Sequence, residues 1–261
     1  MISTIHPIPA FTDNYIWAPS EAQSQQVCVV DPGDAQPVIE YLESNGLQLS
    51  DILITHHHPD HTGGIQELKN RYSCRVVGPS SSGIQGISEF VSEGDSVTLF
   101  GQIFSVIEVP GHTLDHIAYY CEDENQIDPI LFCGDTLFAA GCGRLFEGTP
   151  EMMHLSLGKL SALPANTRVF CTHEYTMANL QFAIAADAEN DVLIERIESE
   201  AAKRAANEPT LPSSIELELA TNPFLRCREP NLQKSAEIQS GRTPRNEVEV
   251  FAALRAWKDS F

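Results

Sequence analysis

The chain has 261 residues, 36 of them acidic and 16 basic, so its formal net charge at pH 7 is −20. Proteins that bind DNA or RNA usually carry a basic surface, and this charge argues against a nucleic-acid partner. No apolar run of about 18 residues predicts a membrane span, and no basic segment followed by an apolar one predicts export. Seven cysteines without CxxC spacing are typical of buried thiols in a reducing compartment. We expect a cytoplasmic monomer with neither membrane nor nucleic-acid partners.

Short apolar runs bounded by turn residues predict mostly strands in the first two thirds of the chain. The expected strands are 2–5, 15–18, 27–30, 52–54, 74–77, 97–100, 102–109, 117–121, 130–133 and 168–171. Helices are expected at 35–45, 64–72 and 150–163. The first of these has Asp34 as its predicted N-cap and Gly46 as its stop.

Strand signals stop after residue 173, and the rest of the sequence predicts helices at 179–188, 191–207 and 246–259. Asn246 and Glu249 have the spacing of a capping box at the start of the last one. We therefore predict a catalytic domain over 1–173 and a smaller all-α domain over 174–261.

The segment Thr55-His56-His57-His58-Pro59-Asp60-His61 follows the apolar strand 52–54. Its four imidazoles and one carboxylate are the donors that zinc, iron or manganese prefers. A polar loop or a histidine tract that binds metal adventitiously is the alternative, but a low-complexity tract would lack the Asp and the HxHxDH spacing.

Three further ligand-type residues stand at strand exits: His112, Asp135 and His173. Loops at one rim of a layered sheet converge, so these side chains are expected to meet the histidine loop. We assign His56, His58 and His112 to one metal, Asp60, His61 and His173 to a second, and Asp135 as the bridge. His116 could replace His112, Asp135 could cap a turn, and His173 is a lone histidine.

Two divalent ions about 3.5–4 Å apart would lower the pKa of a shared water and hold it as hydroxide, so no Ser or Cys nucleophile is required. Zinc is the expected ion, with iron and manganese as alternatives because the donors suit all three. Asp60 is both a ligand and the candidate for orienting the hydroxide. His6, His57 and His154 are expected to be structural or exposed.

These motifs resemble the metallo-β-lactamase superfamily and, more narrowly, the glyoxalase II (hydroxyacylglutathione hydrolase) family. The broad resemblance rests on the histidine loop, Gly111-His112-Thr113, Gly134-Asp135-Thr136 and His173. The narrow one rests on Thr12-Asp13-Asn14-Tyr15, Gly134-Asp135-Thr136-Leu137-Phe138, Ala140-Gly141-Cys142-Gly143-Arg144, His173-Glu174-Tyr175-Thr176, Asn222-Pro223-Phe224-Leu225-Arg226 and Arg255-Ala256-Trp257-Lys258-Asp259. It implies a four-layer αββα sandwich with a smaller C-terminal all-α domain.

The resemblance also implies an activity: a metal-bridging hydroxide hydrolyses S-(2-hydroxyacyl)glutathione, typically S-D-lactoylglutathione, to glutathione and D-lactate in the second step of methylglyoxal detoxification. It implies that Arg144, Tyr175, Arg255 and Lys258 hold the glutathione portion. Two positions depart from the family pattern, since Phe146 replaces a common tyrosine and Asp115 a common glycine.

Three other functions remain open on the sequence. A glutathione persulfide dioxygenase of the same superfamily, with a single iron, shares much of the ligand set. A metallo-nuclease is opposed by the charge of −20, and a metal-binding regulatory module would bind two ions without thioester turnover.

Overall fold

The computed structural model describes residues 1–21, 24–122 and 128–261. The chain divides into two compact units, which we treat separately. The first unit is Met1–Glu108 with Asp115–Gly134, and the second is Val109–Leu114 with Asp135–Phe261. A six-residue loop between two strands of the first unit therefore belongs to the second.

The first unit contains a sheet in which six strands are ordered as in the sequence: β1 (Ile2–Ala10), β2 (Asn14–Glu21), β3 (Gln26–Val30), β4 (Gln48–Leu53), β5 (Arg75–Pro79) and β6 (Glu89–Val91). β1, β2 and β3 are antiparallel, and β3 to β6 are parallel. Parallel neighbours need crossover connections. Helices α1 (Ala35–Asn45) and α3 (Ile65–Tyr72) provide two of them.

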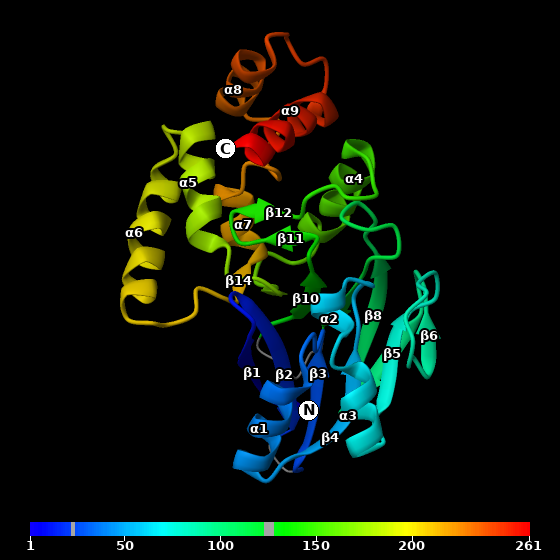
Figure 1. Cartoon of the computed structure of the whole chain (residues 1–261). Helices are drawn as coiled ribbons and strands as arrows, with labels where there is room; N and C mark the ends of the chain where they lie inside the picture. The colour runs from blue at the N-terminus through cyan, green and yellow to red at the C-terminus, as the bar shows by residue number, and fades with distance from the viewer. Residues whose placement is uncertain (22–23, 123–127) are drawn as a thin grey trace. The chain divides into compact units, whose positions relative to one another are not determined.

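Both crossover helices lie against the sheet (Figure 1). Their apolar residues are buried with those of the sheet in one core cluster. Val38 and Leu42 of α1 and Leu68 of α3 are fully buried in this cluster. The predicted ends of α1 are confirmed: the Asp34 side chain accepts from the Gln36 N–H, and Gly46 is left-handed with φ of 64°.

A second, antiparallel group of strands in the first unit is ordered β10 (Ile130–Gly134), β9 (Ile117–Cys121), β8 (Gln102–Glu108) and β7 (Ser96–Leu99). The fully buried Tyr119 of β9 donates its hydroxyl to the Ile54 carbonyl at 2.9 Å, just after β4. Burial raises the pKa of Tyr119, which keeps this hydroxyl protonated. The first unit is therefore a helix layer on two packed sheets.

The second unit is mainly helical: α4 (Pro150–Ser161), α5 (Thr176–Ala186), α6 (Asp191–Ala205), α7 (Ile215–Thr221), α8 (Pro230–Ser240) and α9 (Glu247–Ser260). Two short antiparallel pairs accompany them, β11 (Leu137–Phe138) with β12 (Gly141–Cys142), and β13 (Arg168–Cys171) with β14 (Ser213–Ser214). Phe182, Phe224 and Phe251 are buried against one another in the core of these helices.

The structure contains several elements that the sequence patterns do not predict. These are α2 (Pro59–Thr62), β6, β11, β12, β14, α7 and α8. The expectation of no strand after residue 173 is wrong, because Ser213 and Ser214 pair with β13 although serine has little strand propensity. α5 also begins at Thr176, three residues before its predicted start.

All seven cysteines are buried thiols, as expected, and none of these described residues forms a disulfide. Among the helices of the described chain, none is both long and apolar enough to span a bilayer.

Replacing Tyr119 with Phe removes the hydroxyl that joins the two sheets and leaves the Ile54 carbonyl buried without it. We expect Tyr119→Phe to lower the free energy of unfolding by about 1–2 kcal/mol in chemical denaturation. The neighbouring Tyr120 donates to the Glu122 carboxylate at an exposed site, so Tyr120→Phe is the matched control, with an effect under about 0.5 kcal/mol. Equal effects of the two changes would contradict this assignment.

Candidate metal centre

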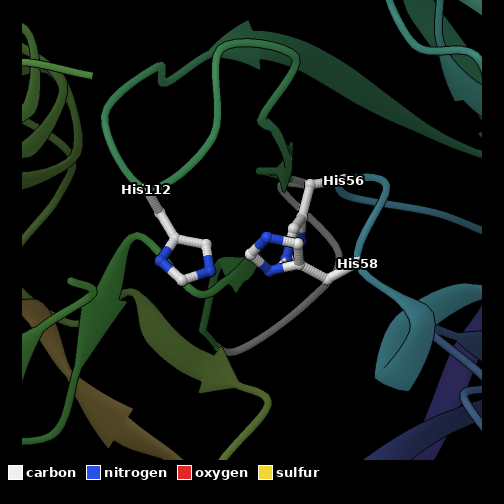
Figure 2. Close-up of side chains that lie close together, drawn as sticks. All are labelled: His56, His58 and His112. Atoms are coloured by element: carbon white, nitrogen blue, oxygen red, sulfur yellow. Dashed lines mark hydrogen bonds between the residues drawn. The ribbon is translucent and has the colours of Figure 1, made fainter. Parts of the chain in front are cut away.

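The four predicted ligands of the first unit lie together on the loop after β4 and on α2. Nε2 of His56 is 3.1 Å from Nδ1 of His58, and the two rings lie edge-on to each other (Figure 2). Nε2 of His61 is 3.4 Å from Oδ2 of Asp60. His57, which is not a predicted ligand, pairs instead with Asp115: its Nδ1 is 2.8 Å from Oδ1 of Asp115.

Asp31 directly follows β3, and its carboxylate fixes the orientation of this loop through three bonds. Its Oδ1 accepts the Thr55 N–H at 2.7 Å, and its Oδ2 accepts the Thr55 hydroxyl at 2.7 Å. The same Oδ2 is 3.0 Å from Nδ1 of His61. The Asp31 carboxylate is buried, so its bonds lie in a medium where charge-assisted hydrogen bonds are strong.

These bonds determine which histidine nitrogens can bind a metal. Since the Thr55 hydroxyl donates its proton to Asp31, it can only accept from Nδ1 of His56, 3.1 Å away. Nδ1 of His61 likewise donates to Asp31. In both rings Nε2 then keeps its lone pair, the tautomer that a metal ligand needs. Asp31, His56 and His61 each bring a potential ligand atom within 4.8 Å of the others.

Close backbone packing holds α2 in this place. A Cβ at Gly33 would lie 1.9 Å from the Asp60 carbonyl oxygen, so only glycine allows the two segments to approach. The Asn14 amide is 3.3 Å from both the carbonyl oxygen and Oδ2 of Asp60. The carboxylate of Asp60 is thereby held beside His61.

In the second unit, Asp135 lies between two predicted histidine ligands. Its Oδ2 is 3.5 Å from Nε2 of His112 and 3.2 Å from Nε2 of His173, and all three side chains are nearly buried. Nδ1 of His112 is 2.8 Å from the Arg144 carbonyl, to which it donates. His112, which Figure 2 also labels, therefore presents Nε2 as a lone pair.

The donor sets of both units fit divalent metal ions. Nε2 of His61, His112 and His173 each lies 3.2–3.5 Å from an Asp carboxylate oxygen. The Nδ1 atoms of His56, His61 and His112 are bonded to the Thr55 hydroxyl, the Asp31 carboxylate and the Arg144 carbonyl, and such N–H bonds are usual around metal sites. His116, the alternative to His112, is fully buried, stacks on His56 at 4.5 Å, and has Nδ1 3.1 Å from the Ile117 carbonyl.

The four predicted substrate-binding residues all belong to the second unit. Tyr175 stacks on His173, with ring centroids 4.7 Å apart. Arg255 is buried and donates to the Cys142 carbonyl at 2.9 Å and to Oδ1 of Asp259 at 2.8 Å. Arg144 is 64% exposed, with Nε 3.8 Å from the same Asp259 oxygen. The sequence places Arg255 and Lys258 on one helical face, and the structure adds Asp259 between Arg255 and Arg144.

Lys258 lies over the Phe182 ring at 5.3 Å from its centroid. Burial, and then the positive charge of Arg255, lower the pKa of its ammonium to about 8. Lys258 is therefore a cation whose charge depends on pH close to neutrality.

Family models match both parts of the chain, the metallo-beta-lactamase superfamily over residues 22–173 and the hydroxyacylglutathione hydrolase C-terminus over residues 174–261. A curated hydroxyacylglutathione hydrolase from Pseudomonas paraeruginosa is 54% identical over 98% of this chain and 99% of its own. The chain belongs to the hydroxyacylglutathione hydrolase family. A second hydroxyacylglutathione hydrolase, from Chromohalobacter salexigens, is 52% identical over 99% of both chains.

The crystal structure of ETHE1 from Myxococcus xanthus has the same fold, with a TM-score of 0.65 and 22% identity over 99% of both chains. The family resemblance seen in the motifs is thus confirmed, as is the α+β sandwich with a C-terminal helical domain. The metallo-β-lactamase fold and the His and Asp clusters indicate a binuclear site for divalent ions.

Sequence reasoning missed Asp31 and Asp259. Asp31-Pro32-Gly33 has the composition of a turn, but Asp31 also ends an apolar strand, the position used to select Asp135. That signal could have found it. Asp259 stands within the C-terminal motif, where its spacing of four from Arg255 suggests an ion pair.

Replacing Asp31 with Asn keeps the shape of the side chain but removes the charge that holds the His61 N–H and the Thr55 hydroxyl. We expect Asp31→Asn to weaken metal binding about 10–100-fold, measured by competition with a chelator. Asp34→Asn is the matched control, because Asn caps a helix as well as Asp, and it should leave the affinity unchanged. Undiminished affinity in Asp31→Asn would remove Asp31 from the site.

Proposed function

We propose that this chain hydrolyses S-(2-hydroxyacyl)glutathione thioesters, typically S-D-lactoylglutathione, to glutathione and D-lactate, as the second step of methylglyoxal detoxification. The observation that carries the proposal is that a relative named hydroxyacylglutathione hydrolase matches 98% of the chain at 54% identity. The dioxygenase alternative is not favoured, because the family model for the hydrolase C-terminus matches residues 174–261. We place the activity in a cytoplasmic monomer.

We assign His56, His58 and His112 to one ion, Asp60, His61 and His173 to the other, and Asp135 to both, with zinc as the expected metal. The lone pairs directed by Asp31 in the first unit and the central place of Asp135 between two imidazoles in the second support this assignment. Two ions held by these residues would supply Lewis-acid chemistry for the thioester carbonyl and would lower the pKa of water at the site toward neutrality.

The protein's own groups then orient the reactants. Asn14 holds Asp60 in place. Asp60 accepts a hydrogen bond from the attacking water and thereby directs a lone pair of the water oxygen toward the substrate. Arg144, Tyr175, Arg255 and Lys258 bind the glutathione portion, so residues 174–261 supply most of the substrate site and residues 1–173 most of the metal site. Phe146 has no hydroxyl to offer the substrate where the family commonly has a tyrosine.

Metal dependence tests the proposal directly. We expect the purified protein to contain two divalent ions per chain and to remove the thioester absorbance of S-lactoylglutathione. Chelation should abolish turnover and zinc should restore it, because both the nucleophile and the polarised carbonyl depend on the ions. Oxygen consumption with glutathione persulfide, in place of thioester loss, would identify the dioxygenase instead. Thioester turnover that survives complete chelation would refute the metal mechanism.

The lowered pKa of Lys258 predicts how substrate binding changes with pH. With a pKa of about 8, the ammonium is charged below this pH and loses its charge as the pH rises through it. An ion pair worth about 1 kcal/mol limits the total rise in the KM for S-lactoylglutathione to about fivefold, and about three- to fourfold of this rise should occur between pH 7 and pH 9. Lys258→Arg should show a flat KM over this range, because arginine stays charged.

The arginine variant also serves as the control for titration of the substrate itself, and spontaneous thioester hydrolysis is subtracted at each pH. If wild type and Lys258→Arg gave the same pH profile, Lys258 would have no part in binding.

A further inference from the structure

The hairpin β11–β12 lies in the sequence between an assigned metal ligand and an assigned substrate-binding residue. It begins two residues after Asp135, and Arg144 follows two residues after its end. The residue at its tip, Ala140, has φ of 55°, in the left-handed region that residues with a Cβ rarely adopt. A residue other than glycine keeps this backbone conformation only where the surrounding structure stabilises it.

Glu218 of α7 stabilises the backbone of Ala140 in this conformation. Its carboxylate is fully buried, and Oε2 accepts the Ala140 N–H at 2.8 Å. The other oxygen, Oε1, accepts from Nη2 of the buried Arg196 at 2.7 Å and from the Ser213 hydroxyl. A buried carboxylate without a counter-charge is very costly, and Arg196 supplies that counter-charge to Glu218.

Other side chains bind the remaining polar groups of the hairpin. The amide of Asn222, at the end of α7, lies 3.1 Å from the Phe138 carbonyl, 2.8 Å from the Gly141 carbonyl and 2.9 Å from Oε2 of Glu218. The Asn179 amide donates to the Ala139 carbonyl at 2.9 Å. The hairpin thus depends on helical side chains for hydrogen bonds that a wider sheet would otherwise supply.

The hairpin in turn contacts residues assigned to substrate and metal. The Phe138 ring lies edge-on to His173 at 5.9 Å and to Tyr175 at 5.5 Å. The carbonyl of Cys142, in β12, accepts from Arg255. A displacement of the hairpin would therefore move Tyr175, Arg255 and Arg144 together.

We infer that Glu218 is a positioning residue for glutathione binding, acting through the β11–β12 hairpin; this rests on the proposed function. A purely structural ion pair between α6 and α7 would need only Oε1. The second oxygen is bonded to the Ala140 N–H, at a backbone position that needs support, and this directs the effect of Glu218 to the hairpin. Glu218 is not among the residues assigned to the metals or to the substrate, so its role is to position others.

Glu218→Gln tests the inference, because it keeps the size of the side chain and removes the charge that two sets of donors share. We expect the KM for S-lactoylglutathione and the Kd for glutathione, measured by calorimetry on the metal-loaded enzyme, to rise about tenfold, since small misplacements of binding groups have effects of this size. The kcat should change less than about threefold and the metal content should stay at the wild-type value. Amide exchange at Ala140 should accelerate.

Asn222→Ala is the second variant, in case Glu218→Gln does not fold. It removes two hairpin hydrogen bonds and leaves the Arg196–Glu218 ion pair in place. It should raise the same KM and Kd, and a double variant should show less than the product of the two effects, because both residues hold one hairpin.

Asp187→Asn is the matched control. Asp187 is also a buried carboxylate in an ion pair, with Arg226, but it lies at the opposite end of α5 from Tyr175. Asp187→Asn should lower the Tm, because it breaks a buried ion pair. It should leave the KM and the Kd within about twofold of wild type, because in the described part of the chain Asp187 bonds to neither the hairpin nor Tyr175.

The inference is overturned if Glu218→Gln or Asn222→Ala lowers the Tm as Asp187→Asn does but leaves the Kd for glutathione unchanged. Failure of the proposed function looks different: the wild-type enzyme would not cleave S-lactoylglutathione. In that case a raised Kd for glutathione in both hairpin variants still supports the role of Glu218, and an unchanged one refutes it.

Discussion

The buried carboxylate of Asp31 is the constraint on which the metal loop of the first unit depends. Each neutral imidazole has one N–H and one lone pair, and a loop with four histidines could adopt many combinations of tautomer and ring orientation. Asp31 removes this freedom by accepting from His61 directly and from His56 through Thr55. Its position follows from the parallel pairing of β3 with β4, in which the Asp31 N–H donates to the Leu53 carbonyl at 2.9 Å.

The second unit solves the same problem with backbone groups. The Arg144 carbonyl fixes the tautomer of His112. The backbone can lie this close only because Gly143 has no Cβ, which would be 2.0 Å from the Asp135 carbonyl oxygen. The segment that follows β12 therefore orients one ligand with its backbone and offers the Arg144 guanidinium with its side chain. On the proposed assignments, this short segment joins a metal ligand to a substrate-binding residue, and Glu218 supports the hairpin from which the segment continues.

The sequence predicted what is local and missed what depends on neighbouring strands. The histidine loop and the ends of α1 follow from residues within a few positions of one another, so patterns reveal them. Asp31 ends an apolar strand as Asp135 does, but its bonds to Thr55 and His61 follow only from the register of β3 and β4. Glu218 resembles one more acid in an acidic helix until Arg196 and Ala140 are placed beside it. β14 is a strand because it pairs with β13, which the local sequence of β14 does not reveal. The seven proposed ligands came from spacing, whereas the residues that orient them came from the fold.

A chain with a net charge of −20 must still bind glutathione, whose two carboxylates outnumber its single ammonium. Screening limits the repulsion to charges within about 8–10 Å, so a few local cations are sufficient. Placing these cations together has a cost, because burial first, and then the positive charge of Arg255, lower the pKa of Lys258. Asp259 offsets part of this cost by bonding Arg255. A bound carboxylate favours the charged form of Lys258, because an opposite charge nearby raises the pKa of an ammonium. On the proposed assignment of Lys258 to the substrate site, substrate binding above pH 8 is therefore coupled to proton uptake at Lys258, and the affinity declines in alkaline solution.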